Sequence, residues 1–365
     1  MVRRTVRSAI SGLALSAVAL SGCAIQQEAV ENQVIEVVEE TVEVADVLRH
    51  PLTGFELAGE SVSGPSVAIK IDNTGAGRPQ VGIAAADMVF EELVEGGVTR
   101  YLAVFHTAIP AEVGPVRSGR PQDADLVRSL GGVFVFSGVG NSNVREIIRG
   151  SGLQLVEHDT SGGTPDGQFF FRSSRKPAPV NLHIEASALS ESYASLATPV
   201  QQFDFTSDPS EASAVASGDD AQSIRVAFSA GIESVWQWDD ATGTYLKFLS
   251  NGSPDIDADG TQISATNVVV LTPNYFDVEG LPSAKIGGTI ESAFVFTGGN
   301  MVSGLFDASV LGDPIRLTDG DGNSLYLSPG KTFILLPPGA GSTAGGVTPG
   351  SVSYESNGEI VTRTL

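Results

Sequence analysis

Two arginines three residues apart, Arg117 and Arg120, stand among glycines and prolines in the stretch VGPVRSGRPQD. The planar guanidinium group of arginine binds phosphate and carboxylate groups through paired hydrogen bonds. The chain has 365 residues and a formal net charge of −22, yet nine of the eleven basic residues between positions 66 and 185 are arginines. We therefore expect a local cationic recess on an acidic protein, with an anionic ligand as its partner.

Other polar residues of the same segment stand where apolar runs begin or end. In an open α/β sheet ligands collect at strand ends, so we expect the loops that carry these residues to form the walls of a pocket. A glycine-rich turn that opens a helix also suits an anion, because its backbone N–H groups are free. The predicted ligand-binding residues are Asp72, Asn73, Arg78, Glu91, Glu92, Arg100, Arg117, Ser118, Arg120, Gly138 and Asn141.

The arginines also have a purely structural interpretation. Arg78, Arg100 and Arg117 would then pair with Asp72, Asp87 and the glutamates, and would compensate carboxylates buried in the fold. Replacing Arg117 with alanine separates the two interpretations. Loss of ligand binding in a folded protein indicates a binding site, whereas an unfolded protein indicates a structural network.

The spacing of apolar runs and turns predicts an α/β N-terminal domain followed by a β-rich, sandwich or barrel-like C-terminal domain. Residues 51–202 alternate strands with short helices, whereas residues 224–338 contain short strands separated by Gly, Asn, Asp and Pro turns. Residues 203–223 are small, polar and acidic, which predicts a linker, and residues 339–365 are predicted to be a C-terminal tail. The predicted strands are 66–71, 87–93, 98–105, 132–138, 223–229, 233–239, 243–249, 267–272, 292–299, 323–330 and 332–338, and the predicted helices are 80–86, 123–130, 142–150 and 183–197.

Residues 1–22 have the layout of a lipoprotein signal peptide. Three arginines precede an apolar run that is too short to span a membrane, and the run ends in Leu-Ser-Gly-Cys. This ending resembles a bacterial lipoprotein processing site, which implies that Cys23 becomes the lipidated N-terminus. The alternative is an ordinary signal peptide with an unrelated cysteine. We expect an extracytoplasmic protein anchored to the cell membrane through Cys23, with residues 23–50 as an acidic tether.

Composition and motif spacing argue against several function classes. A sequence pI near 4.4 argues against nucleic acid as a partner, because binding to backbone phosphates needs a basic surface. The stretch PGKT at 329–332 ends like a phosphate-binding loop, but Leu325 occupies the position of the opening glycine. The stretch DIDADG at 255–260 begins like a calcium loop, but Thr266 stands where a bidentate glutamate is needed. Turns are the simpler interpretation of both stretches, with a weak cation site as the alternative for the second.

Three blocks of the first half resemble the YerB-like family of bacterial lipoproteins, whose function is uncharacterised: AIKIDN, RPQVGIAAADMVFEELVEGGVTRYLAVF and VGPVRSGRPQD. The resemblance continues in NVVVL and LSPGKTFILL of the second half. It implies a two-domain envelope protein and carries no established activity. In outline the first blocks are also similar to the LytR–CpsA–Psr phosphotransferases, which attach anionic glycopolymers to the cell wall. That similarity implies a phosphate clamp of Arg78, Arg117 and Arg120, with Asp72 as a positioning residue or as a ligand of a divalent cation.

These observations support two hypotheses for function. In the first, a lipid-anchored envelope protein binds an anionic ligand that bears phosphate or pyrophosphate, in cell-wall glycopolymer metabolism. In the second, the arginines only hold the fold, and the protein is a noncatalytic scaffold whose β-rich domain contacts a partner protein or wall glycan. Its contact surface would include Trp236, Trp238 and Tyr245 if they are exposed, whereas packing in the core is the commoner reason for two tryptophans on one face of a strand. The sequence identifies no catalytic residue, and enzyme activity and a need for a divalent cation both stay open.

Overall fold

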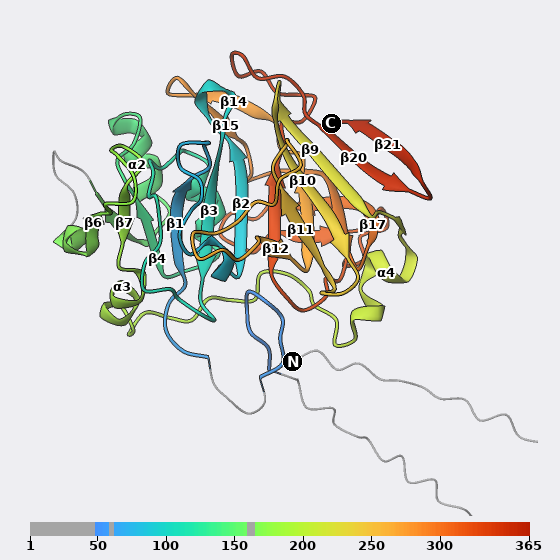
Figure 1. The fold of residues 1–365 in the computed structure, drawn as a ribbon, viewed down its shortest axis with the longest axis horizontal. Helices are drawn as coiled ribbons and strands as arrows, with labels where there is room; N and C mark the ends of the chain where they lie inside the picture. The colour runs from blue at the N-terminus through green and yellow to red at the C-terminus, as the bar shows by residue number, and fades with distance from the viewer. Residues whose placement is uncertain (1–47, 58–61, 159–164) are drawn as a thin grey trace, which may run out of the picture. The chain divides into compact units, whose positions relative to one another are not determined.

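The computed structural model describes residues 48–57, 62–158 and 165–365 of the chain (Figure 1). The predicted signal peptide, Cys23 and nearly all of the predicted tether lie outside these residues. In the part of the chain that is described, no helix is long and apolar enough to cross a membrane.

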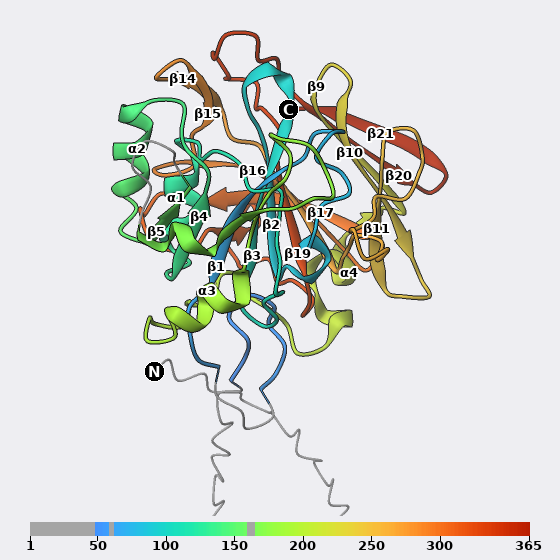
Figure 2. The ribbon, with the colours of Figure 1, turned by 60° about the vertical axis from the view of Figure 1, so that its left-hand side comes forward.

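A mixed sheet of eleven strands contains strands from both halves of the chain (Figures 1 and 2). Its strand order is β18-β17-β16-β13-β19-β2-β3-β1-β4-β5, and β8 pairs with β17. The two halves join where β19 pairs in parallel with both β2 and β13. The bounds are β1 (Val67–Asp72), β2 (Met88–Leu93), β3 (Thr99–Phe105), β4 (Val133–Phe136), β5 (Gln154–Glu157), β8 (Asp219–Asp220), β13 (Asn267–Leu271), β16 (Ile290–Thr297), β17 (Asn300–Asp307), β18 (Arg316–Thr318) and β19 (Thr332–Leu336).

A second sheet of six antiparallel strands packs against the C-terminal part of the central sheet. The ring of Trp236 on β10 lies 4.8 Å from that of Phe333 on β19, and the ring of Tyr354 on β20 lies 6.1 Å from that of Phe296 on β16. The C-terminal half is therefore β-rich with two layers, as predicted, and one of these layers continues into the α/β half. The strands, in sheet order, are β12 (Ser264–Ala265), β11 (Thr244–Phe248), β10 (Ile232–Asp239), β9 (Ser223–Ser229), β20 (Ser351–Ser356) and β21 (Glu359–Thr364).

Burial along the strands follows the sequence pattern. Every residue of β1 and β2 is buried, as expected for largely apolar strands that are covered on both faces. In β9, by contrast, Ile224, Val226 and Phe228 are buried and the residues between them are not, which is the pattern of a strand with one face in solvent.

The helices are short, and most of them belong to the N-terminal half, which has the predicted α/β character. In Figure 2, α1 and α2 lie beside β4 and β5. The α-helices are α1 (Asp123–Arg128), α2 (Ser142–Arg149), α3 (Ala186–Ser192) and α4 (Ser213–Ser217), and the 3₁₀ helices are Ile83–Ala85, Glu95–Gly97, Pro165–Phe169 and Pro209–Glu211. Two hairpins complete the fold: β6 (Phe170–Arg172) with β7 (Leu182–Ile184), and β14 (Tyr275–Val278) with β15 (Leu281–Ala284).

Three predicted elements differ from the structure. The helix predicted over 80–86 is only one 3₁₀ turn, because Gly82, with φ of 85°, interrupts the backbone before it. The helix predicted over 183–197 begins only at Ala186, because the preceding residues pair with β6. The strand predicted over 323–330 is replaced by isolated bridges at Ser324 and Leu327.

The predicted linker and tail contain elements of the two sheets. Within residues 203–223, Phe203 and Phe205 are buried, and β8 pairs with β17. Within residues 339–365, β20 pairs with β9, and β21 pairs with β20. The partners of β8 and of β20, namely β17 and β9, lie far away in the chain, so the local composition of these segments does not reveal those two pairings.

Candidate functional site

Arg117 is bound to the carboxylate of Asp72. Its Nε donates to Asp72 Oδ2, and its Nη1 donates to the carbonyl oxygen of Pro179 at 3.1 Å. The other oxygen of Asp72 accepts hydrogen bonds from the backbone N–H and the hydroxyl of Thr74, both at 2.6 Å. Burial raises the pKa of Asp72, but the bonds from Thr74 and the charge of Arg117 outweigh it and lower the pKa. Asp72 and Arg117 thus make their hydrogen bonds with other groups of the protein.

Arg120 and Arg100 converge on Glu95. Arg120, which is 3% exposed, donates from Nε and Nη2 to the two oxygens of Glu95, and from Nη1 to the carbonyl oxygens of Ser118 and Gly119 at 3.1 and 2.8 Å. Arg100 donates to the same Ser118 carbonyl at 3.2 Å, and its Nη2 lies 3.6 Å from Glu95. Burial and the neighbouring Arg120 lower the pKa of Arg100 to about 10. The contact of Arg100 with Glu95 is of the kind that the structural interpretation expects, and Arg120, which that interpretation did not include, pairs with the same carboxylate.

Glu92 belongs to a separate buried cluster. Its carboxylate pairs with the ammonium group of Lys70, which also donates to Asp123 Oδ1 at 2.7 Å, and all three side chains are fully buried. Burial lowers the pKa of Lys70 to about 8, although the charge of Asp123 opposes the change. The cluster has no exposed surface for a ligand.

Gly138 and Asn141 shape the start of α2. The carbonyl oxygen of Gly138 accepts a hydrogen bond from the N–H of Gly119 at 3.0 Å. Asn141 is the N-cap residue of α2 and accepts a hydrogen bond from the N–H of Val144 at 3.1 Å. Its Nδ2 donates to the carbonyl oxygen of Glu279 at 3.0 Å. The contacts seen at this turn are structural.

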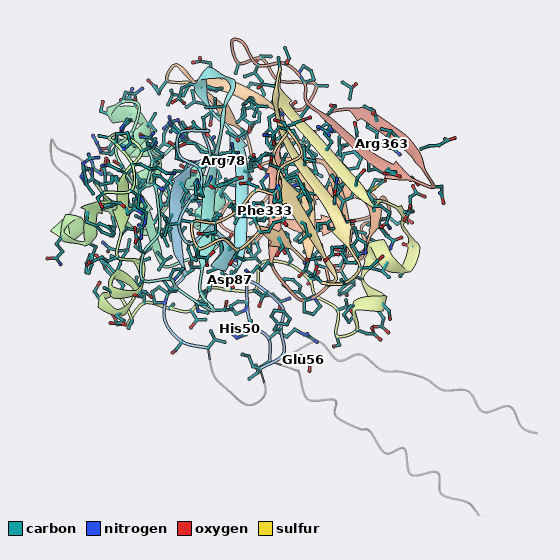
Figure 3. All side chains as sticks on the ribbon, in the orientation of Figure 1. His50, Glu56, Arg78, Asp87, Phe333 and Arg363 are labelled. Atoms are coloured by element: carbon teal, nitrogen blue, oxygen red, sulfur yellow. The ribbon has the colours of Figure 1, made fainter. Side chains whose placement is uncertain are left out.

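Asn73, Arg78 and Glu91 line a cavity of about 280 Å³, together with Lys247 and Asp255 from the C-terminal half. Figure 3 shows Arg78 at the end of the central sheet opposite Asp87, next to the loop that follows β1. The structure therefore brings together only part of the predicted set, and it adds charged residues from the second half of the chain.

A hydrogen-bond network fixes Glu91 and Lys247 in this cavity. Glu91 Oε1 accepts from Asn73 and Thr99, both at 3.0 Å, and Oε2 accepts from Ser234 at 2.9 Å and lies 3.4 Å from the ammonium nitrogen of Lys247. Lys247 also donates to Ser234 at 2.6 Å, and its nitrogen lies 4.9 Å from the centre of the Trp236 ring. Both charges are buried and compensated.

Arg78 and Asp255 are less well satisfied. Arg78 Nη2 donates to Asn73 Oδ1 at 2.6 Å, but its Nε lies 3.8 Å from Asp255 Oδ1, which is too long for a hydrogen bond. Neither Arg78 Nε nor Asp255 Oδ2 has a hydrogen-bond partner among the described residues. Burial raises the pKa of Asp255, against the opposing charges of Lys247 and Arg78.

The turn that carries Asp255 is held against the first half of the chain. Asp257 accepts hydrogen bonds from the N–H groups of Gly82 and Ala84 at 3.1 and 2.9 Å, and the N–H of Ala258 donates to the carbonyl oxygen of Gln80 at 2.8 Å. The stretch that begins like a calcium loop is a turn in which Asp257 binds backbone N–H groups. Among the described residues, no three His, Cys, Asp or Glu side chains are grouped as metal ligands.

Sequence reasoning missed Lys247 and Asp255. The signal for Lys247 is its place in β11, where it alternates with Tyr245 on the buried face of the strand, since a lysine on such a face needs a buried partner. The hypothesis that Trp236 and Tyr245 belong to an exposed contact surface is wrong, because both are fully buried. Trp236 packs on Phe333 between the sheets, and the hydroxyl of Tyr245 donates to the carbonyl oxygen of Ala221 at 3.0 Å.

Comparisons with known proteins identify relatives of the chain. Two family models match, described as the N-terminal domain (residues 52–199) and the C-terminal domain (residues 224–334) of a protein of unknown function, DUF3048. The Bacillus subtilis (strain 168) protein named "Putative lipoprotein YerB" is 32% identical over 141 residues, which are 39% of this chain and 41% of the relative, so the alignment spans less than half of that relative. The crystal structure of the YerB protein from Bacillus subtilis has the same fold, with a TM-score of 0.66 and 22% identity over 79% of this chain and 96% of that chain. The chain belongs to the DUF3048 family, and the predicted resemblance to YerB-like proteins is confirmed.

Proposed function

We propose that the protein is a membrane-anchored lipoprotein of the cell envelope that binds a small ligand through an anionic group in the cavity beside Arg78. Lipid attachment at Cys23, and hence a place outside the cytoplasm, is supported by the Leu-Ser-Gly-Cys stretch and by the name of the Bacillus subtilis relative. Cys23 lies outside the described residues.

The observation that carries the binding proposal is the state of the Arg78 guanidinium. The Arg78 side chain is 27% exposed and lines the cavity, and its Nε has no hydrogen-bond partner among the described residues. Arg117 and Arg120, by contrast, donate to Asp72 and Glu95. A ligand carboxylate or phosphate would accept charge-assisted hydrogen bonds from the exposed part of the Arg78 guanidinium. The anion-binding residue in this proposal is Arg78, without the clamp of Arg117 and Arg120, and Asn73 orients it by accepting a hydrogen bond from its Nη2.

The size of the cavity limits what enters it. Its volume of about 280 Å³ is near the lower end of ligand pockets, which begin at about 300 Å³. A phosphate- or pyrophosphate-bearing cell-wall polymer would therefore place only its anionic end inside. Enzyme activity and a bound divalent cation are not part of this proposal.

Calorimetric titration of the full-length protein in detergent tests the proposal. The ligands are inorganic phosphate, pyrophosphate and the simple carboxylate 4-methylpentanoate, each with and without Mg²⁺. We expect at least one anion to bind saturably, and Arg78→Gln to abolish that binding. The matched control is Arg149→Gln on α2, where the arginine side chain is 57% exposed. Equal binding by Arg78→Gln, or absence of Arg78-dependent binding by every phosphate and carboxylate ligand, amino acids included, would overturn the proposal.

A second candidate function is a noncatalytic envelope scaffold that binds no small ligand. The pairing of Arg117 with Asp72 and of Arg120 with Glu95 favours it, because these arginines then serve only the fold. It predicts that Arg78→Gln changes stability alone, and that no anion in the titration produces saturable heat.

A further inference from the structure

Asp255 lines the same cavity as Arg78, and one oxygen of its carboxylate is buried without a hydrogen-bond partner among the described residues. The residue is 2% exposed, and the oxygen without a partner is Oδ2. Buried polar atoms are nearly always hydrogen-bonded, and an uncompensated buried carboxylate costs free energy. The backbone of Asp255 is also held in place, because its N–H donates to the carbonyl oxygen of Lys247 at 3.0 Å and its carbonyl oxygen accepts from Ile263 at 2.9 Å. A cationic hydrogen-bond donor that enters the cavity would compensate the charge of this carboxylate.

The other charged groups around the cavity already have partners. Glu91 accepts hydrogen bonds at both oxygens, Lys247 donates to Ser234, and Glu233 pairs with Arg225. The cavity therefore offers one cation and one anion with free hydrogen-bonding capacity, side by side. A phosphate dianion would satisfy the cation but would lie beside a carboxylate of the same charge.

We infer that the ligand carries an α-amino-acid group, with its carboxylate bound to Arg78 and its ammonium group bound to Asp255. This inference rests on the proposed function, because it names the ligand class for the same cavity. The two charges of an α-amino acid are attached to one carbon atom, so their close spacing matches neighbouring groups such as Arg78 Nε and Asp255 Oδ1, which are 3.8 Å apart. Both contacts would be charge-assisted hydrogen bonds, which are stronger than neutral ones.

The raised pKa of Asp255 is consistent with this ligand class. Burial disfavours the ionised carboxyl group, despite the charges of Lys247 and Arg78. A bound ammonium group would add a close cation and would lower that pKa.

A second cavity provides room for the side chain of the ligand. It has a volume of about 720 Å³, and Val98 and Ile232 line both cavities. Leu93, Pro282 and Val347 give it further apolar surface. A ligand side chain directed toward Val98 and Ile232 would gain apolar contacts with both residues, so we expect leucine to bind roughly tenfold more tightly than glycine.

Titration of the full-length protein with matched ligands tests the inference. Leucine, as each enantiomer, is compared with 4-methylpentanoate, which lacks the amino group, and with 3-methylbutylamine, which lacks the carboxylate. We expect leucine to bind roughly tenfold to a hundredfold more tightly than either analogue. Asp255→Asn should remove the preference for leucine over 4-methylpentanoate, whereas the matched control Asp259→Asn, an exposed position of the same turn, should retain it.

A cavity-blocking variant covers the case in which Asp255→Asn does not fold. Gly75 is exposed and lines the cavity, and no atom lies within 4 Å of the position of an added Cβ, so Gly75→Trp should fold and lose leucine binding. Arg78-dependent binding of 4-methylpentanoate, phosphate or pyrophosphate that is as tight as that of leucine would overturn this inference and leave the proposed function standing. Absence of binding by every ligand would overturn both.

Discussion

Replacing Arg120 with alanine tests the conclusion that the arginine loop holds the fold. The guanidinium group donates to Glu95 and to the carbonyl oxygens of Ser118 and Gly119. A hydrogen bond from a charged group contributes about 1.5–3 kcal/mol to the free energy of unfolding. The side chain of Glu95 is 43% exposed, so water can replace the hydrogen bonds that Glu95 loses in the variant, and their loss costs little. The two carbonyl oxygens then account for most of the cost, and we expect the free energy of unfolding to fall by about 3 kcal/mol.

Thermal and urea denaturation, followed by circular dichroism, would measure this change. At about 2–4 °C per kcal/mol, the Tm of Arg120→Ala should fall by roughly 10 °C. Arg149→Ala is the matched control, because Arg149 pairs with Glu146 on the surface of α2, and it should change the free energy of unfolding by at most about 0.5 kcal/mol. An Arg120→Ala protein of unchanged stability that no longer binds anions would refute the reasoning and would place the anion site in the arginine loop.

Three further predictions follow from buried charges and from the N-terminal stretch. Lys70→Met leaves the carboxylates of Glu92 and Asp123 buried without their cation, so urea unfolding should show a loss of about 3–5 kcal/mol, and wild-type stability would contradict the pairing. Asp255→Asn should raise the Tm at pH 7, because a carboxyl whose pKa is raised in the fold destabilises the fold when ionised. This gain in Tm should shrink as the pH falls below the raised pKa and disappear below the ordinary pKa of an aspartate, where the wild-type carboxyl is protonated in the folded and the unfolded protein. A gain independent of pH would exclude this cause. The charged and titratable groups that face Asp255 are Arg78, Lys247, Glu91 and Tyr101. Cys23→Ser should move the protein from the membrane fraction to the soluble fraction and abolish labelling with fatty acid, and continued labelling would place the lipid elsewhere.

Patterns of neighbouring residues predicted ten of the 21 strands in the described residues. The apolar run at 66–71 corresponds to β1, and the alternating run at 223–229 corresponds to β9. Such patterns reflect burial on two faces or on one face, so they can be read from a short window of sequence. The pairing of β20 with β9 and of β19 with β2 could not be read in this way, because each joins segments that are distant in the chain.

The sequence by itself determined the types of element, the family resemblance, the signal-like segment with its single cysteine, and the concentration of arginines in one half. Only the tertiary structure decided which arginine keeps a free donor. Arg78 and Arg117 are equivalent candidates in the sequence, but Arg117 lies against Asp72, whereas Arg78 faces a cavity beside Asp255. The bond between Asp257 and Gly82, which are 175 residues apart, helps to hold the turn that carries Asp255 in that cavity. Free hydrogen-bonding capacity depends on distances across the whole fold, and no local pattern of residues encodes those distances.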